Sequence, residues 1–165
     1  MSTSVQLAGA LTALALWGLP AQAQNLNAQD QKFIQDAAKG GMMEVQMGRL
    51  GLEKGQSQGV KSLSQRLIDD HSKGNRELEA LAKRKGASLP QEDAKMVYST
   101  PLASKNGAEF DREFARTAVE DHEKDIREFE KEANSGSDPD VKNWARQTLP
   151  TLRAHLSAAQ ALPKP

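Results

Sequence analysis

The sequence contains no cysteine, and this absence removes several classes of site at once. It excludes disulfides, thiolate metal sites, cysteine nucleophiles and a lipid attached through an N-terminal cysteine. The chain also lacks an excess of either charge, because 22 Lys and Arg residues are balanced by 22 Asp and Glu residues. Without a basic excess to neutralise phosphates, nucleic acid is not expected as a partner.

Strand signals are scarce too. β-Branched runs are few, and no Asn-Gly or Asp-Gly turn joins two alternating segments. No Gly-rich phosphate loop, Ser nucleophile elbow or His-Glu-x-x-His zinc motif occurs. The sequence therefore indicates an all-α protein, and it favours a non-catalytic role over an enzymatic one.

The first 23 residues have the features of a secretory signal peptide. An apolar run extends from Leu7 to Leu19, which is too short to span a bilayer. Ala21 and Ala23 form an Ala-x-Ala cleavage pattern, although no Lys or Arg precedes the run. We expect cleavage after Ala23, a periplasmic or secreted mature chain that starts at Gln24, and no transmembrane span in it. An uncleaved anchor or a misassigned start codon is the alternative.

Residues 24–165 are enough for one domain with a single core. Helical periodicity predicts four long helices, over residues 27–54, 57–85, 107–134 and 138–159. Asn27, Ser57 and Asp138 stand at the positions of N-caps, and Gly55 and Gly86 follow the first two helices. A proline inside a helix removes a backbone hydrogen bond, so we expect Pro150 to kink or break the last helix.

The linkers between these helices differ in length, and this predicts the topology. The first two and the last two helices are joined by short linkers, so each pair should form an antiparallel hairpin. The middle linker, residues 87–106, includes Pro90, Pro101 and a predicted helical turn over residues 92–98. It spans up to roughly 66 Å when extended, whereas a helix of about 26 residues is roughly 39 Å long. One long crossover between two hairpins predicts a ferritin-like four-helix bundle, and a simple up-down-up-down bundle with a flexible middle loop is the alternative.

Every histidine of the chain falls on the inward stripe of a predicted helix. His71, His122 and His155 lie near the middle of the second, third and fourth helices, and Glu44 has the same position in the first. Residues at mid-helix meet at one level whatever the directions of the helices. Because unpaired polar groups are costly to bury, such a set is either a group of metal ligands or an internal hydrogen-bond network.

Two interpretations of this set of polar residues are possible. In the first, a transition metal such as zinc, copper, iron or manganese is bound by Glu44, His71, His122 and His155. Asp70 and Asp121 would then be further ligands or acceptors that fix the imidazole tautomers. The thioethers of Met43 and Met47 would suit Cu(I).

In the second interpretation the same polar groups pair with one another and fix the register of the helices. Methionine more commonly fills irregular gaps in a core, and Met42, Met43 and Met47 would do so here.

Four glycines in the first predicted helix, Gly40, Gly41, Gly48 and Gly51, lie on both sides of Glu44. Relative to alanine they cost about 3–4 kcal/mol of helix propensity. Close approach of a neighbouring helix is the simplest compensation, and space for a ligand or a hinge is the alternative.

Several motifs together resemble one bacterial family. They are the run FIQDAAKGGMMEV at residues 33–45, the Asp-His pairs at 70–71 and 121–122, the Phe-Asp-Arg sequence at 110–112 and the run LPTLRAHL at 149–156. The two Asp-His pairs are 51 residues apart and share further Lys, Arg and Glu positions. Over nearly the whole mature length, the chain is similar to the exported family catalogued as domain of unknown function 4142. This resemblance implies a ferritin-like bundle and no established activity.

The Glu-x-x-His motif of ferritin-like di-iron proteins is absent, because Ile68, Val119 and Leu152 stand three residues before the histidines. Di-iron oxidase chemistry is therefore not expected. Two functions remain. The chain is either an exported non-catalytic bundle that serves as a stress-related or envelope interaction module, or a metal-binding or metal-redox protein. An envelope protein or a second copy of the chain would be the partner of the first.

Overall fold

The computed structural model describes residues 26–91, 93 and 96–162, and in this part of the chain it is all-helical with no strand. Its elements are α1 (Ala28–Lys54), α2 (Gln58–Lys85), the 3₁₀ helix η1 (Met96–Ser99), α3 (Pro101–Ser104), α4 (Gly107–Ser135) and α5 (Pro139–Gln160). Among the described residues, no helix is both long and apolar enough to cross a membrane. The predicted signal peptide lies outside the described residues.

The predicted capping residues determine where the long helices begin. The side chain of Asn27 accepts a hydrogen bond from the Asp30 amide, and that of Ser57 accepts one from the Val60 amide. Asp138 caps α5 in the same way, with Pro139 at the first helical position. At the other end of α2, Gly86 adopts a left-handed conformation with φ 65°, which glycine tolerates without strain.

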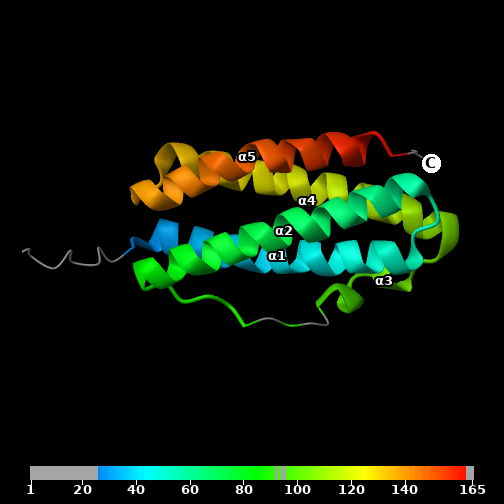
Figure 1. The fold of residues 1–165 in the computed structure, drawn as a ribbon, viewed down its shortest axis with the longest axis horizontal. Coiled ribbons are helices and arrows are strands. Elements are labelled where there is room, and N and C mark those ends of the chain that lie inside the picture. Colours follow the sequence, from blue (N-terminus) through cyan, green and yellow to red (C-terminus); the bar gives the residue numbers. More distant parts are fainter. Residues whose placement is uncertain (1–25, 92, 94–95, 163–165) are drawn as a thin grey trace, which may run out of the picture.

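The topology is the predicted ferritin-like one, two antiparallel hairpins joined by one long crossover (Figure 1). Helices α1 and α2 form one hairpin, and α4 and α5 form the other. The segment between α2 and α4 runs back along the outside of α1 to the opposite end of the bundle (Figure 1). Helices α2 and α4 consequently run in the same direction, so the simple up-down-up-down alternative is wrong.

Hydrogen bonds to α1 hold the crossover in place. The side chain of Gln46, a buried residue, donates to the Asp93 carbonyl at 2.5 Å and accepts from the Val97 amide at 3.0 Å. Lys54 donates to the Ala103 carbonyl at 2.6 Å. In the described residues of this segment the helical turns are η1 and α3, and η1 overlaps the last three residues of the predicted turn at 92–98.

The core is divided into two apolar clusters by a polar layer. One cluster contains Phe33, Leu78, Phe129 and Leu149, and the other contains Met47, Leu67, Phe110 and Phe114. Along every long helix the residues of one cluster precede the polar position and those of the other follow it. These polar positions are Glu44, His71, His122 and His155.

Helix α1 is buried over more of its surface than its predicted stripe, because α2, α4 and the crossover all cover it. The helical periodicity predicts an inward stripe of Phe33, Ala37, Gly40, Glu44, Met47 and Gly51. Ile34, Ala38, Val45 and Leu50 are buried as well, whereas Ala37 and Gly40 are only half-buried. Helix α5 continues through Pro150, so the predicted break does not occur, and the alternative of a kink stays a prediction.

Three of the four glycines of α1 lie where a neighbouring side chain or backbone leaves no room. A Cβ atom would lie 2.0 Å from Asn75 Oδ1 at Gly41, 2.7 Å from the Ser64 carbonyl at Gly48 and 2.1 Å from Ser64 Oγ at Gly51. Close packing against α2 therefore accounts for these three. Gly40 differs, since its Cβ would meet only the Asp125 carboxylate at 3.8 Å.

The turn of each hairpin is held by a carboxylate from the other hairpin. Asp111 of α4 accepts from the amides of Gln56 and Ser57 at 2.9 and 2.7 Å. Asp30 of α1, which is fully buried, accepts from the amides of Ser137 and Asp138 at 2.9 and 2.8 Å. The two interactions lie at opposite ends of the bundle and fix how the hairpins dock.

Candidate metal centre

The three histidines, one each from α2, α4 and α5, meet in the polar layer of the core. Their ring centroids are 5.2 Å apart for His71–His155 and for His122–His155, and 5.7 Å apart for His71–His122. One nitrogen from each ring lies within 4.8 Å of the other two. His122 and His155 are fully buried, and His71 is half-buried.

The tautomer of His122 follows from its own helix. Its Nδ1 lies 2.9 Å from the carbonyl oxygen of Ala118, one turn earlier in α4. A carbonyl can only accept a hydrogen bond, so Nδ1 carries the proton. In a neutral ring Nε2 is then left with a free lone pair.

The tautomer of His155 is fixed by a carboxylate from another helix. His155 Nε2 lies 2.8 Å from Asp70 Oδ2 on α2. Because a carboxylate accepts, Nε2 carries the proton and Nδ1 keeps its lone pair. This Nδ1 lies 3.2 Å from Nε2 of His122. Two lone pairs thus face each other. Only a proton or a metal ion between the two nitrogens would make this contact favourable.

His71 supplies a third unused nitrogen. Its Nε2 is buried and has no hydrogen-bond partner in the described part of the chain. Such an unsatisfied group costs about 1–3 kcal/mol. The cluster therefore combines two opposed lone pairs with one orphaned nitrogen, all from imidazoles.

Burial keeps the rings neutral. It is the main cause that lowers the pKa of His71 to about 3 and that of His122 to about 4, and repulsion between the rings adds to the effect. Burial also lowers the pKa of His155, although the hydrogen bond from His155 to Asp70 opposes this. A proton shared between two rings is consequently unfavourable near neutral pH, whereas neutral imidazoles are suited to a metal ion.

The spacing fits a metal of the zinc or copper type. Two nitrogens bound tetrahedrally at about 2.0–2.1 Å from an ion are roughly 3.3 Å apart, close to the 3.2 Å between His122 and His155. Asp70 fills the role of the acceptor that orients a ligating histidine from its far side. The sequence predicted an acceptor at this residue, and its partner is His155 rather than the adjacent His71.

Glu44 lies beside the cluster rather than in it. Its Oε1 is 3.7 Å from His122 Nδ1, which is too far for a hydrogen bond, and its Oε2 has no partner among the described residues. It faces the edge of the His122 ring opposite to the one that faces His155. Burial, followed by the charges of Asp121 and Asp125, raises the pKa of Glu44 well above its usual value.

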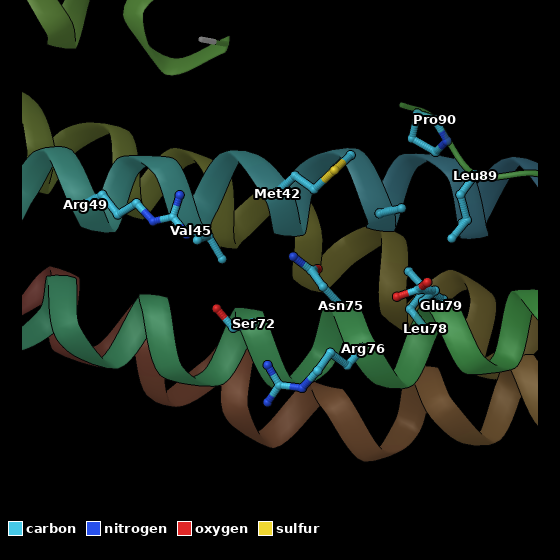
Figure 2. A pocket seen from close by; sticks show the side chains of 11 residues that line it. Met42, Val45, Arg49, Ser72, Asn75, Arg76, Leu78, Glu79, Leu89 and Pro90 are labelled. Atoms are coloured by element: carbon cyan, nitrogen blue, oxygen red, sulfur yellow. The ribbon is translucent and has the colours of Figure 1, made fainter. Parts of the chain in front are cut away.

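The remaining predicted residues surround the cluster at a greater distance. Asp121 is half-buried, makes no hydrogen bond to an imidazole in the structure and lines a pocket with Met43 and Glu44. Met47 is buried in an apolar cluster. Met42 lines a different pocket, of about 480 Å³, between α1, α2 and the segment that follows α2. Figure 2 shows Met42 there with Leu89, Pro90 and the guanidinium groups of Arg49 and Arg76.

Sequence reasoning missed two features of this site. The Ala118 carbonyl belongs to the backbone, and no residue type signals its role. Asp125 stands three residues after His122, one turn along the same face, and that spacing was the available signal. Burial is the main cause that raises the pKa of Asp125 to about 7, and the charge of Glu128 adds to the effect.

Fold and site together define a ferritin-like four-helix bundle with three histidines clustered in its core. The chain belongs to the family described as domain of unknown function 4142 (DUF4142), whose model matches residues 18–162. No curated protein matches the chain by sequence.

Several solved structures share the fold. A DUF305 fragment from Deinococcus radiodurans superposes with a TM-score of 0.70 at 19% identity, over 82% of this chain and 95% of that one. CopM in its Cu(I)-bound form gives 0.66 at 18% identity, over 79% and 92%. A putative spore coat protein from Bacillus halodurans gives 0.68 at 16% identity, over 86% and 89%. At these identities the likeness concerns the fold alone.

Proposed function

We propose that this protein binds one transition-metal ion of the copper or zinc type through His71, His122 and His155. The observation that carries the proposal is the hydrogen-bond pattern of the rings. The Ala118 carbonyl and the Asp70 carboxylate take the protons of two imidazoles and leave their lone pairs facing each other at 3.2 Å. A cation is the partner that satisfies both lone pairs and the unpaired His71 nitrogen together.

The chemistry of the donors limits the metal. Three neutral imidazoles without a thiolate suit zinc, copper, iron or nickel better than magnesium or calcium. Copper is supported further by the likeness to CopM, whose structures include Cu(I)-, Cu(II)- and Ag-bound forms. We propose binding, storage or transfer of the ion rather than catalysis, because the cavity that His71 and His155 themselves line is too small for an organic substrate. The cavity beside the histidines has a volume of about 40 Å³.

The second candidate is a purely structural polar layer in an exported interaction module. The bond of 2.8 Å between His155 and Asp70 favours it, because it joins α5 to α2 without any metal. Under this alternative the unpaired nitrogen of His71 would have no role.

His71→Leu separates the two candidates. Leucine has a similar size, and His71 makes no hydrogen bond through Nε2 in the described structure. The change therefore removes a ligand without breaking the hydrogen bonds of His122 to Ala118 and of His155 to Asp70. We expect wild-type protein to bind one equivalent of Cu(I), Cu(II) or Zn(II) in competition with a chelator. His71→Leu should bind at least tenfold more weakly, the order of effect that changes around a metal site produce.

The thermal stability of the same two proteins gives the control. Metal should raise the melting temperature of the wild type and have little effect on the variant, since ligand binding stabilises the folded state by mass action. Wild-type protein that binds none of these ions, or equal affinities for the two proteins, would overturn the metal assignment and leave the structural layer.

We propose in addition that the chain is exported and cleaved after Ala23, so that the bundle acts in the periplasm or outside the cell. The apolar run and the Ala-x-Ala pattern support this. Intact mass of the protein recovered from the periplasm should correspond to a chain that begins at Gln24. Protein that stays in the cytoplasm at full length would refute export.

A further inference from the structure

A second polar site lies against the histidine cluster, on the other side of His122. It is a pocket of about 450 Å³ between α1 and α4, close to η1. Five acidic side chains line it together with the thioethers of Met43 and Met96, and three of them, Glu44, Asp121 and Asp125, are not paired with a lysine. Oxygen donors thus surround a space large enough for a hydrated cation.

The charges of this pocket do not cancel. Two of its lysines are engaged by acidic residues one turn away, Lys32 by Asp36 and Lys124 by Glu128. Lys39 also lines the pocket and forms no ion pair in the described structure. Asp121 and Asp125 likewise have neither a hydrogen bond nor an ion pair among the described residues, so these two carboxyl groups have no bonded partner in the pocket.

Glu44 is the observation that points to a ligand. Its side chain is 2% exposed, it lines the pocket, and its Oε2 has no hydrogen-bond partner in the described part of the chain. A buried carboxylate oxygen in a pocket with two other unpaired carboxylates is costly unless a cation or a proton joins it.

Asp125 connects the pocket to the histidines. It also lines the small cavity whose wall includes His71 and His155. Gly40 lies at this boundary, where a Cβ would be in ordinary van der Waals contact with Asp125 Oδ2 at 3.8 Å. Gly41 lines the cavity itself.

We propose that this carboxylate pocket is a second and weaker site for a divalent transition-metal ion, and that the ion reaches the histidine cluster from it past Asp125. The inference rests on the proposed function, because it requires that the histidines bind metal. It adds a ligand class, carboxylate oxygen, and a direction of access from the α1–α4 face.

Stopped-flow binding of Cu(II) to the full chain tests the route. Asp125→Asn preserves the size of the side chain and breaks no hydrogen bond or ion pair of the described structure. We expect it to slow association about threefold to tenfold, because focused negative charge raises the rate of cation capture. The equilibrium affinity of the histidine site should fall by no more than the same factor, because charge steering acts mainly on the association rate.

Glu123→Gln is the matched control, since it removes one charge from an exposed residue of α4 that does not line the pocket. It should change the association rate less than twofold, because an exposed charge is largely screened at physiological salt. Equal rates for Asp125→Asn and Glu123→Gln would overturn the route.

The second site is tested in the His71→Leu background, where Cu(II) binding by the histidines is weakened. A residual weak equivalent of Cu(II) should remain there and should be lost on adding Glu44→Gln or Asp125→Asn. Residual binding that is absent, or that both changes leave intact, would overturn the carboxylate site. Failure of the proposed function is distinguishable, because wild-type protein would then show no tight equivalent at all.

Discussion

Replacing Asp70 by asparagine tests the hydrogen-bond argument at the metal centre. The Asp70 carboxylate accepts from His155 Nε2 at 2.8 Å, and this bond leaves the Nδ1 lone pair facing His122. Asparagine keeps the size of the side chain but removes the charge that holds the proton on Nε2. Replacement of such a partner typically lowers metal affinity 10–100-fold. Because the Asp70 side chain is 42% exposed and water replaces part of the interaction, we expect about tenfold.

The affinity is measured by competition of metal-free protein with a chelator for Cu(II) or Zn(II). A tenfold loss corresponds to about 1.4 kcal/mol of binding free energy, which such a titration resolves. The midpoint of thermal unfolding with metal should fall in the same order as the affinity, because stabilisation follows the dissociation constant.

Asp69→Asn is the control. It removes the same charge from the adjacent residue, which is exposed and accepts a hydrogen bond from Gln65 at 2.9 Å rather than from an imidazole. Screening by salt should hold its effect below about twofold. If the two variants lose affinity equally, charge alone explains the effect and our assignment of the His155 tautomer is wrong.

Two further predictions concern stability without metal. Gly51→Ala should lower the free energy of unfolding by about 1–2 kcal/mol, because its Cβ would lie 2.1 Å from Ser64 Oγ. Gly74→Ala should raise the free energy of unfolding by about 0.5–1 kcal/mol, because its Cβ meets nothing within 4 Å. Denaturant titration that ranks the two variants in the opposite order would contradict the packing argument. Asp125→Asn should stabilise the protein above pH 7. The pKa of the Asp125 carboxyl is raised from 3.8 to about 7, so the wild-type folded state loses stability as the pH rises through that interval. We expect a gain on the order of 1–2 kcal/mol, well below the limit of about 4 kcal/mol set by 1.36 kcal/mol per pKa unit, and the difference between the two proteins should vanish near pH 4.

Most of the fold could be predicted because its determinants are local. Asn27, Ser57 and Asp138 cap helices through bonds to residues two or three positions away, and such patterns are visible in a single sequence. The length of the 87–106 linker was enough to predict the crossover, since a short connection cannot span the bundle. The extra burial of α1 was not predictable, because the crossover that covers it has no periodicity of its own.

The sequence could predict that the residues of the site lie at one height along the bundle, but not how their side chains are arranged there. Helical periodicity placed Glu44 in the polar layer with the histidines, as the structure does. It could not show that Glu44 faces the Nδ1 edge of His122 while His155 faces its Nε2 edge. That difference depends on side-chain rotamers and on the rotation of each helix about its axis, which a spacing of three or four residues does not fix.

The carboxylates that hold each hairpin turn from the opposite hairpin have a consequence for how the metal centre assembles. Most contacts of α1 are with α2 and most contacts of α4 are with α5, whereas Asp30 and Asp111 find their partners only when the two hairpins dock. His71 belongs to one hairpin, and His122 and His155 belong to the other. The centre thus resembles a metal site at a subunit interface, although both halves belong to one polypeptide. All three histidines can bind one ion only after the two hairpins have docked.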